Sequence, residues 1–207
     1  MVAVRAEAED HASVSEQRFV IHGVSWETYV TLRDALDDHS SLKLTYLSGT
    51  LELMSPSNLH EDAKKIIASL IEVWAMEHDV DLRGFGGATF RRQAKERGLE
   101  PDECYKLGKL EDDDVPDIAI EVIVTNALVN KMAVYAGLGV REVWEWRPSN
   151  GNILVHCLLG DRYETQSHSS VLPALDIAEL SRFVTPGENQ TRLAKEYQAT
   201  LRSTRRG

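Results

Sequence analysis

The chain of 207 residues is long enough to bury a core in one domain, and its hydrophobic fraction of 43% is ordinary for a globular protein. Its two cysteines are too few for a disulfide framework or a zinc site, which favours a reducing cytoplasm. No apolar run approaches the ~18 residues of a membrane span. The net charge of -10 argues against a generic nucleic-acid coat, because phosphate contacts come from Lys and Arg.

The N-terminal segment mixes acids with bases and has no apolar signal core, which predicts a flexible tail over residues 1–20. The first helix is expected over residues 25–36, "SWETYVTLRDAL", where Ser25 is a suitable N-cap.

Residues 41–57, "SLKLTYLSGTLELMSPS", alternate apolar and polar side chains on both sides of a Ser-Gly pair. This pattern predicts a β-hairpin with a two-residue loop. In that register Leu47 faces Thr50 and Thr45 faces Glu52, so that Glu52 lies on the more polar face of its strand.

Residues 57–78 carry the strongest helical pattern, with an apolar stripe at 3.6-residue spacing. His60 lies on the same stripe. It could act as a base or donate to a phosphate, but a packed or capping histidine is the commoner case.

The second half of the chain alternates short apolar runs with one further helical segment. A helix is expected over residues 125–139, capped by Thr125 or Asn126 and stopped by Gly137 or Gly139. Strands are expected at "ATFRRQ", "DECYKL", "DIAIEVIV", "EVWEW" and "ILVHCLL". The order αββαβββαββ predicts an α/β fold with a mixed β-sheet flanked by helices.

Several acids on the expected strands could hold a metal ion. Asp117 and Glu121 lie ~13 Å apart along one strand, so a single Mg²⁺ with bonds of about 2.1 Å cannot join both. Asp117 follows Pro116, where an Asp often closes a turn. Asp102 could lie beside Glu121 across the sheet, and Glu52 could add a third carboxylate. Such oxygen ligands suit Mg²⁺ or Mn²⁺; the alternative is a set of exposed strand acids.

Basic residues near these acids could contact phosphate. Lys131 is expected in the second turn of its helix, where it could reach back over the end of the Glu121 strand, or it could be a snorkelling surface lysine. Arg91, Arg92 and Lys95 form a local basic segment that could bind DNA, and residues 186–207 form a basic C-terminal tail.

Four segments, in this order and spacing, resemble the Uma-type putative restriction endonucleases of the PD-(D/E)XK nuclease superfamily: "YLSGTLELMSPSNLHE", "TFRRQAKERGLEPDECYKLG", "PDIAIEV" and "YAGLGVREVWEW". The resemblance runs from about residue 24 to residue 183. It implies a restriction-endonuclease-like fold, expected as a single domain over residues 21–185.

The resemblance also implies roles for particular residues. Asp102, Glu121 and Glu52 correspond to the acids that hold Mg²⁺ or Mn²⁺. The sequence departs from the superfamily pattern two residues after Glu121, where Ile123 stands in place of a lysine. Lys131 in the next helix corresponds to the displaced lysine of this family. His60 and Asp117 fall on positions that the family often keeps, and are auxiliary candidates.

The activity implied is metal-dependent hydrolysis of DNA phosphodiester bonds, with no membrane partner. A homodimer is expected, because one site breaks one strand and two sites related by a two-fold axis would match the symmetry of duplex DNA. The alternative is a catalytically silent nucleic-acid-binding or scaffold domain, which the missing acid-x-Lys pattern and the acidic charge favour.

Overall fold

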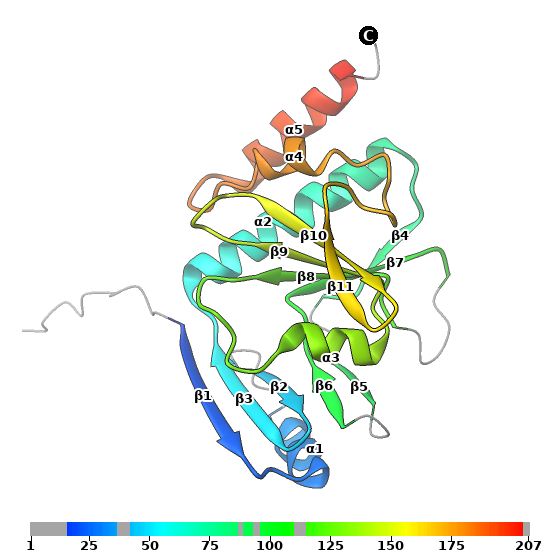
Figure 1. Cartoon of the computed structure of the whole chain (residues 1–207). Coiled ribbons are helices and arrows are strands. Elements are labelled where there is room, and N and C mark those ends of the chain that lie inside the picture. The colour runs from blue at the N-terminus through cyan, green and yellow to red at the C-terminus, as the bar shows by residue number, and fades with distance from the viewer. Residues whose placement is uncertain (1–15, 37–41, 87–88, 93–95, 110–114, 205–207) are drawn as a thin grey trace, which may run out of the picture.

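Two β-sheets and five helices build the computed structural model, which describes residues 16–36, 42–86, 89–92, 96–109 and 115–204 (Figure 1). The first sheet is antiparallel, in the order β1 (Gln17–His22), β3 (Thr50–Ser55), β2 (Lys43–Leu47), β6 (Arg97–Leu99), β5 (Phe90–Arg92). The second sheet has the order β11 (Arg162–Gln166), β10 (Ile153–Leu159), β9 (Glu142–Trp146), β8 (Ile118–Val122), β7 (Glu103–Leu107), β4 (Leu82–Gly84). The helices are α1 (Trp26–Ala35), α2 (Asn58–Glu77), α3 (Lys131–Leu138), α4 (Ile177–Ser181) and α5 (Gln190–Thr204).

The expected α/β class with a mixed sheet flanked by helices is confirmed, because β8 and β9 run parallel within the otherwise antiparallel second sheet. The strands form two sheets rather than one. The chain passes from β6 to β7 over residues 100–102, where Pro101 has no amide hydrogen with which to continue a ladder.

The hairpin of β2 and β3 has the expected register, with Leu47 opposite Thr50 and Thr45 opposite Glu52. Its loop residues Ser48 and Gly49 have φ angles of 43° and 84°, the left-handed conformation that a tight two-residue hairpin loop requires.

Helix α2 covers one face of the second sheet. Ser57 caps it by accepting a hydrogen bond of 3.2 Å from the amide of His60. Its buried stripe packs with Ile118, Ile120 and Val122 of β8, which point to this face. The opposite face of β8 carries Ala119, which packs in a second apolar cluster with α3.

The chain ends of the domain differ from the expected boundaries. Residues 17–20, placed in the tail by sequence, belong to β1 and pair with β3. Within the basic segment 186–207, residues 190–204 form α5, which buries Leu193, Tyr197 and Leu201 in the core beside α2. The apolar spacing of these three residues gives the helix a buried face that its basic composition hides.

Helix α3 begins later than its sequence predicts. Asn130, rather than Thr125 or Asn126, is the N-cap and accepts 3.0 Å from the amide of Ala133. The helix ends at Gly139, whose φ is 90°. Lys131 is therefore the first helical residue, and residues 123–130 form a loop along the end of β8.

Helix α3 lies between the two sheets (Figure 1). Arg97 of β6 crosses it and donates 2.7 Å to the carbonyl of Ala133. A Cβ atom at Gly137 would lie 1.7 Å from the Arg97 guanidinium, so only glycine permits this contact.

Within the described residues, no helix has the length and apolarity needed to span a membrane.

Candidate functional site

Asp102 lies at the point where the chain enters the second sheet. Its amide donates 3.1 Å to the carbonyl of Ile120, and its Oδ2 accepts 2.7 Å from the amide of Val122. Because Glu103 pairs with Ile120 across antiparallel strands, Asp102 lies opposite Glu121. The structure thus brings these two predicted acids together, each about 2% exposed.

Lys43 of β2 pairs with Asp102 in the interior. Its Nζ bonds to Asp102 Oδ1 and donates 3.2 Å to the carbonyl of Pro101. Burial opposes the charge on this lysine, but the attraction of Asp102 and Glu121 prevails and raises its pKa. Burial likewise opposes the charge on Asp102, but Lys43 and His60 hold the Asp102 pKa well below its usual range. Both groups are therefore charged at neutral pH.

Sequence reasoning missed Lys43. It occupies a strand position on the face that also carries Thr45 and Glu52, a signal that could have been noticed. Nothing in the sequence, however, places it against Asp102, which lies 59 residues away.

His60 bridges two carboxylates and is fully buried. Its Nε2 lies 2.8 Å from Asp102 Oδ1, and its Nδ1 lies 2.6 Å from Glu16 Oε1. Burial lowers the pKa of His60, but the hydrogen bonds to Asp102 and Glu16 outweigh it and raise the pKa to about 9. The ring is therefore doubly protonated at neutral pH and donates to both acids.

The side chain of Glu16 is fully buried and bonds to His60 on the side opposite Asp102. It stands one residue before β1, inside the segment expected to be a tail. Its Oε2 accepts 3.0 Å from the amide of Thr125, and also bonds to the Thr125 hydroxyl. Burial opposes the charge on Glu16, but the bonds from His60 and Thr125 lower its pKa. The start of β1 is thereby bound to the site and to the loop after β8.

Glu121 faces α3, on the side of β8 away from α2. Its Oε2 lies 2.7 Å from the Nζ of Lys131, and its Oε1 accepts from the hydroxyl of Tyr135. Burial, together with the nearby charge of Glu121, raises the Tyr135 pKa well above its usual range, so the phenol remains a donor. Lys131 does reach back over the end of the Glu121 strand, as its position in the sequence suggested.

Glu52, the third predicted acid, is buried and bonds to β1 and to the loop after β8. Its Oε1 pairs with Arg18 of β1, while its Oε2 accepts 2.7 Å from the amides of Leu128 and Val129. These two amides belong to the loop 123–130. Glu52 therefore holds this loop against the first sheet, and both of its oxygens are occupied.

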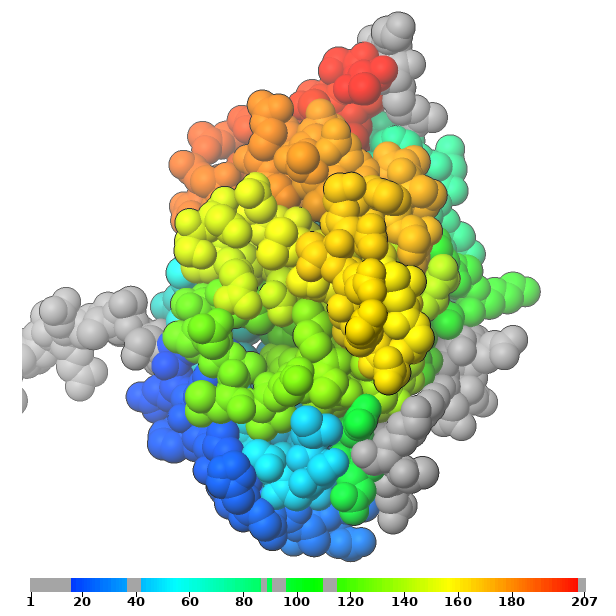
Figure 2. Space-filling model, viewed as in Figure 1, coloured from blue at the N-terminus to red at the C-terminus, as the bar shows by residue number. Residues whose placement is uncertain are grey.

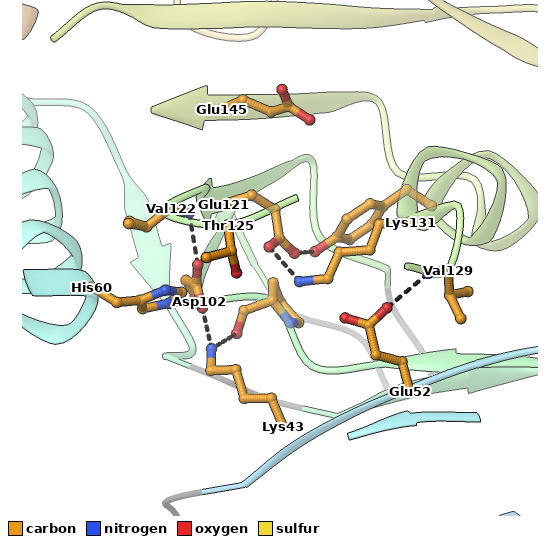
Figure 3. A network of polar contacts seen from close by, with 12 residues as sticks. Lys43, Glu52, His60, Asp102, Glu121, Val122, Thr125, Val129, Lys131 and Glu145 are labelled. Atoms are coloured by element: carbon orange, nitrogen blue, oxygen red, sulfur yellow. Dashed lines mark hydrogen bonds and ion pairs between the residues drawn. The ribbon is translucent and has the colours of Figure 1, made fainter. Parts of the chain in front are cut away.

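Figure 3 shows the residues around the two acids, with Lys43 and His60 beside Asp102 and Lys131 beside Glu121. Within the parts of the chain that the structure describes, no three His, Cys, Asp or Glu side chains are grouped as a metal site. Two hard carboxylates nevertheless suit Mg²⁺, which proteins often bind through one or two carboxylates with substrate phosphates and water completing the shell. In this structure lysine ammonium groups neutralise both.

The remaining predicted residues lie outside this group. Asp117 is at the far end of β8, where it accepts 3.0 Å from the amide of Leu107 and pairs with Arg141 at 3.3 Å. Asp117 therefore stabilises the turn through which the chain enters β8. Arg91 and Arg92 belong to β5, and Lys95 lies outside the described residues.

A pocket of about 200 Å³ opens beside Glu121 and Lys131. It lies between the loop 123–130, α3 and β9, and Figure 2 shows the surface hollowed between the segment that holds α3 and the strands above it. Glu145, directly opposite Glu121 on the parallel neighbour β9, faces the same space.

Comparisons with known proteins show to which family the chain is similar. No curated protein matches the chain. A solved structure described as a "putative nuclease belonging to DUF820 from Anabaena variabilis ATCC 29413" is 14% identical, covering 69% of this chain and 91% of that one with a TM-score of 0.48. The family described as Uma2, "Putative restriction endonuclease", matches residues 26–187, which include every residue of the Asp102 and Glu121 group except Glu16 and Arg18. The chain belongs to the Uma2 family.

Proposed function

We propose that this protein is a divalent-metal-dependent endonuclease that hydrolyses DNA phosphodiester bonds. The observation that carries the proposal is the pair of buried carboxylates Asp102 and Glu121, each neutralised by a lysine, beside an open pocket. Burying charged groups is costly, and a lysine-compensated pair of acids next to solvent-accessible space is typical of a functional centre.

Asp102 and Glu121 would hold the ion, because their oxygens are hard ligands on adjacent strands. Glu52 takes a different role in this proposal: Arg18 and the amides of Leu128 and Val129 bond to it, so it positions the loop 123–130 beside the metal site. When bound, Mg²⁺ or Mn²⁺ would lower the pKa of a coordinated water and offset negative charge on the reacting phosphate.

The two lysines have different tasks in this proposal. Lys43 is buried behind Asp102, where it keeps the carboxylate ionised. Lys131 lies at the pocket, where its ammonium group can transfer from Glu121 to an oxygen of the bound phosphate and stabilise the charge that develops there.

His60 is a positioning residue that acts through Asp102. With both ring nitrogens protonated, it donates to Asp102 and to Glu16 and so fixes the carboxylate in one orientation. Second partners of this kind orient metal-binding carboxylates and tune their affinity.

Cutting of labelled duplex DNA with and without Mg²⁺ or Mn²⁺ tests the proposal. Asp102→Asn and Glu121→Gln are each expected to lower the cutting rate by about a hundredfold or more, because removal of a ligand removes the metal. Thermal unfolding of each variant controls for folding. Cutting at the wild-type rate by both variants would exclude the assignment.

One observation favours the alternative, a catalytically silent nucleic-acid-binding or scaffold domain. Both carboxylates are already neutralised by lysines, so the fold is electrostatically complete without a metal. A silent domain would bind DNA equally well with and without Mn²⁺ and would not cut it.

We also propose that the working form is a homodimer. Strand β1 ends the first sheet, and its Phe19 and Ile21 side chains are 64% and 47% exposed. An edge strand with exposed apolar residues supports pairing with a second copy. Sedimentation equilibrium is expected to give twice the chain mass of 23.2 kDa. A monomer that makes double-strand breaks, at a rate first order in protein, would rule the dimer out.

A further inference from the structure

The pocket beside Glu121 is closed at its base by the hydrophobic core and open at the loop. Tyr135 and Val143 line it and are about 1% and 0% exposed, whereas Asn126 and Asn130 at the other end are exposed. Its remaining apolar wall includes Val129. A concave space that combines apolar walls with converging polar groups is the usual form of a site for a small organic group.

The charges that line the pocket are already paired. Arg147 lies 3.2 Å from Glu145 and donates 2.9 Å to the Oδ1 of Asn126, while Lys131 pairs with Glu121. The pocket therefore offers hydrogen-bonding groups without an excess of positive charge. This balance suits a neutral, flat, polar ring rather than a second phosphate.

The pocket wall is preformed. Glu52 fixes the loop through the amides of Leu128 and Val129, and Arg18 fixes it by donating 2.8 Å to the Thr125 hydroxyl and 3.1 Å to the Thr125 carbonyl. A wall held in this way needs no ordering when a ligand enters, which favours binding.

We infer that this pocket takes the base of an unpaired DNA nucleotide next to the phosphate that is cut. The inference rests on the proposed function, in which the phosphate lies at Glu121 and Lys131. A nucleotide whose phosphate is bound at Glu121 and Lys131 has its base only one sugar away from that phosphate. The base then lies at the mouth of the pocket. The apolar walls contact the faces of the base. The side-chain amino groups of Asn126 and Asn130, whose oxygens accept from Arg147 and from the amide of Ala133, donate to its polar edge.

This arrangement predicts the class of substrate. In a continuous duplex the base is stacked and paired, and it must be extruded before it can enter the pocket. Single-stranded DNA, or a duplex with one unpaired nucleotide, does not require this extrusion. The protein therefore prefers DNA with an unpaired nucleotide at the cut.

The test uses one fluorescein-labelled DNA strand in three forms: alone, in a perfect duplex, and in a duplex where one nucleotide is bulged. Binding is measured by anisotropy and cutting by gel, both with Mn²⁺. The single strand and the bulged duplex are expected to bind and to be cut about tenfold better than the perfect duplex, or more. Equal values for the three forms would overturn the inference and leave the endonuclease proposal intact.

A variant locates the effect in the pocket. Ala127 lines it from the loop, so Ala127→Trp should fill it and reduce the preference to near unity. Met76→Trp places the same side chain on an exposed position of α2, 66% exposed, and should keep the wild-type preference. A preference retained in folded Ala127→Trp would place the unpaired nucleotide elsewhere and contradict the inference. A preference in binding that Ala127→Trp abolishes, without cutting of any form, would support the pocket and contradict the nuclease activity.

Discussion

Glu142 in β9 and Asp102, directly before β7, are both buried acids of the second sheet. Different kinds of hydrogen-bond donor surround their carboxylates. Glu142 accepts 2.7 Å from the Ser169 hydroxyl, 2.6 Å from the amide of Ser170 and 2.9 Å from the indole of Trp144. Asp102 also accepts from one backbone amide, that of Val122, but its other partners are cations, the ammonium group of Lys43 and protonated His60.

The difference indicates what each acid does. The neutral donors around Glu142 belong to the backbone and to short side chains, so Glu142 anchors residues 169–171 to β9 and cannot exchange its partners. Lys43 and His60 hold Asp102 ionised, and Lys131 at the pocket can leave Glu121 when a metal ion neutralises that carboxylate. A pair of buried acids with cationic partners, one of which can exchange, is the better candidate for function.

The largest effect on stability is expected from Lys43→Met, which leaves Asp102 buried without its main counter-charge. Removing one partner of a buried ion pair costs about 3–5 kcal/mol of the free energy of unfolding. Urea denaturation measures it. The double variant with Asp102→Asn should be more stable than Lys43→Met alone, because the unpaired charge is gone. If the two effects simply add, Lys43 and Asp102 are not coupled.

Glu142→Gln is expected to destabilise the fold by about 2–3 kcal/mol, since an amide cannot accept from all the donors that surround the carboxylate. The same denaturation experiment measures this loss. Glu164→Gln, on the exposed edge strand β11, is a matched control that should change stability little. Loss of metal-dependent cutting in a folded Glu142→Gln protein would contradict its purely structural role.

The pH dependence of this loss has a definite sign. Burial raises the pKa of Glu142, but its hydrogen bonds from Ser170, Ser169 and Trp144 outweigh burial and lower it. Its contribution is therefore present above the unfolded pKa of about 4.3. It is lost as the pH falls through the lower folded value. The stability difference between wild type and Glu142→Gln should narrow on acidification from neutral pH, as measured by unfolding at several pH values.

Lys131→Ala tests the cation at the pocket. The cutting rate is expected to fall by about ten- to a hundredfold, because one stabilising charge near the phosphate is removed. Metal binding should change less, and Lys131→Arg should not restore the rate, since a planar guanidinium replaces a compact ammonium group. Single-turnover rates for both variants, with the exposed Lys65→Ala as control, measure this. Normal cutting by Lys131→Ala would exclude the role.

Sequence reasoning could find the parts of the site that depend on local pattern. The register that places Glu52 opposite Thr45 follows from alternation around a two-residue loop, and the structure has it. The strand positions of Asp102 and Glu121 and the helix position of Lys131 predict that the three side chains lie close together, and the structure brings them together.

The rest depends on contacts between distant segments. Glu16 reaches Thr125 across 109 residues, which no local pattern indicates, and composition alone placed it in a tail. The late start of α3 has a similar cause. Residues 125–130 have a helical pattern and are expected from sequence to begin the helix. Glu52, however, accepts from the amides of Leu128 and Val129, 76 and 77 residues away, and holds this segment as a loop.

Calorimetric titration of Mn²⁺ tests most directly whether the cation-paired acids, and not Glu142, form the metal site. Wild type and Glu142→Gln are expected to bind Mn²⁺ with the same stoichiometry. Asp102→Asn and Glu121→Gln are each expected to weaken binding by about ten- to a hundredfold or more. No binding by wild type, or binding that survives unchanged in both Asp102→Asn and Glu121→Gln, would contradict the account.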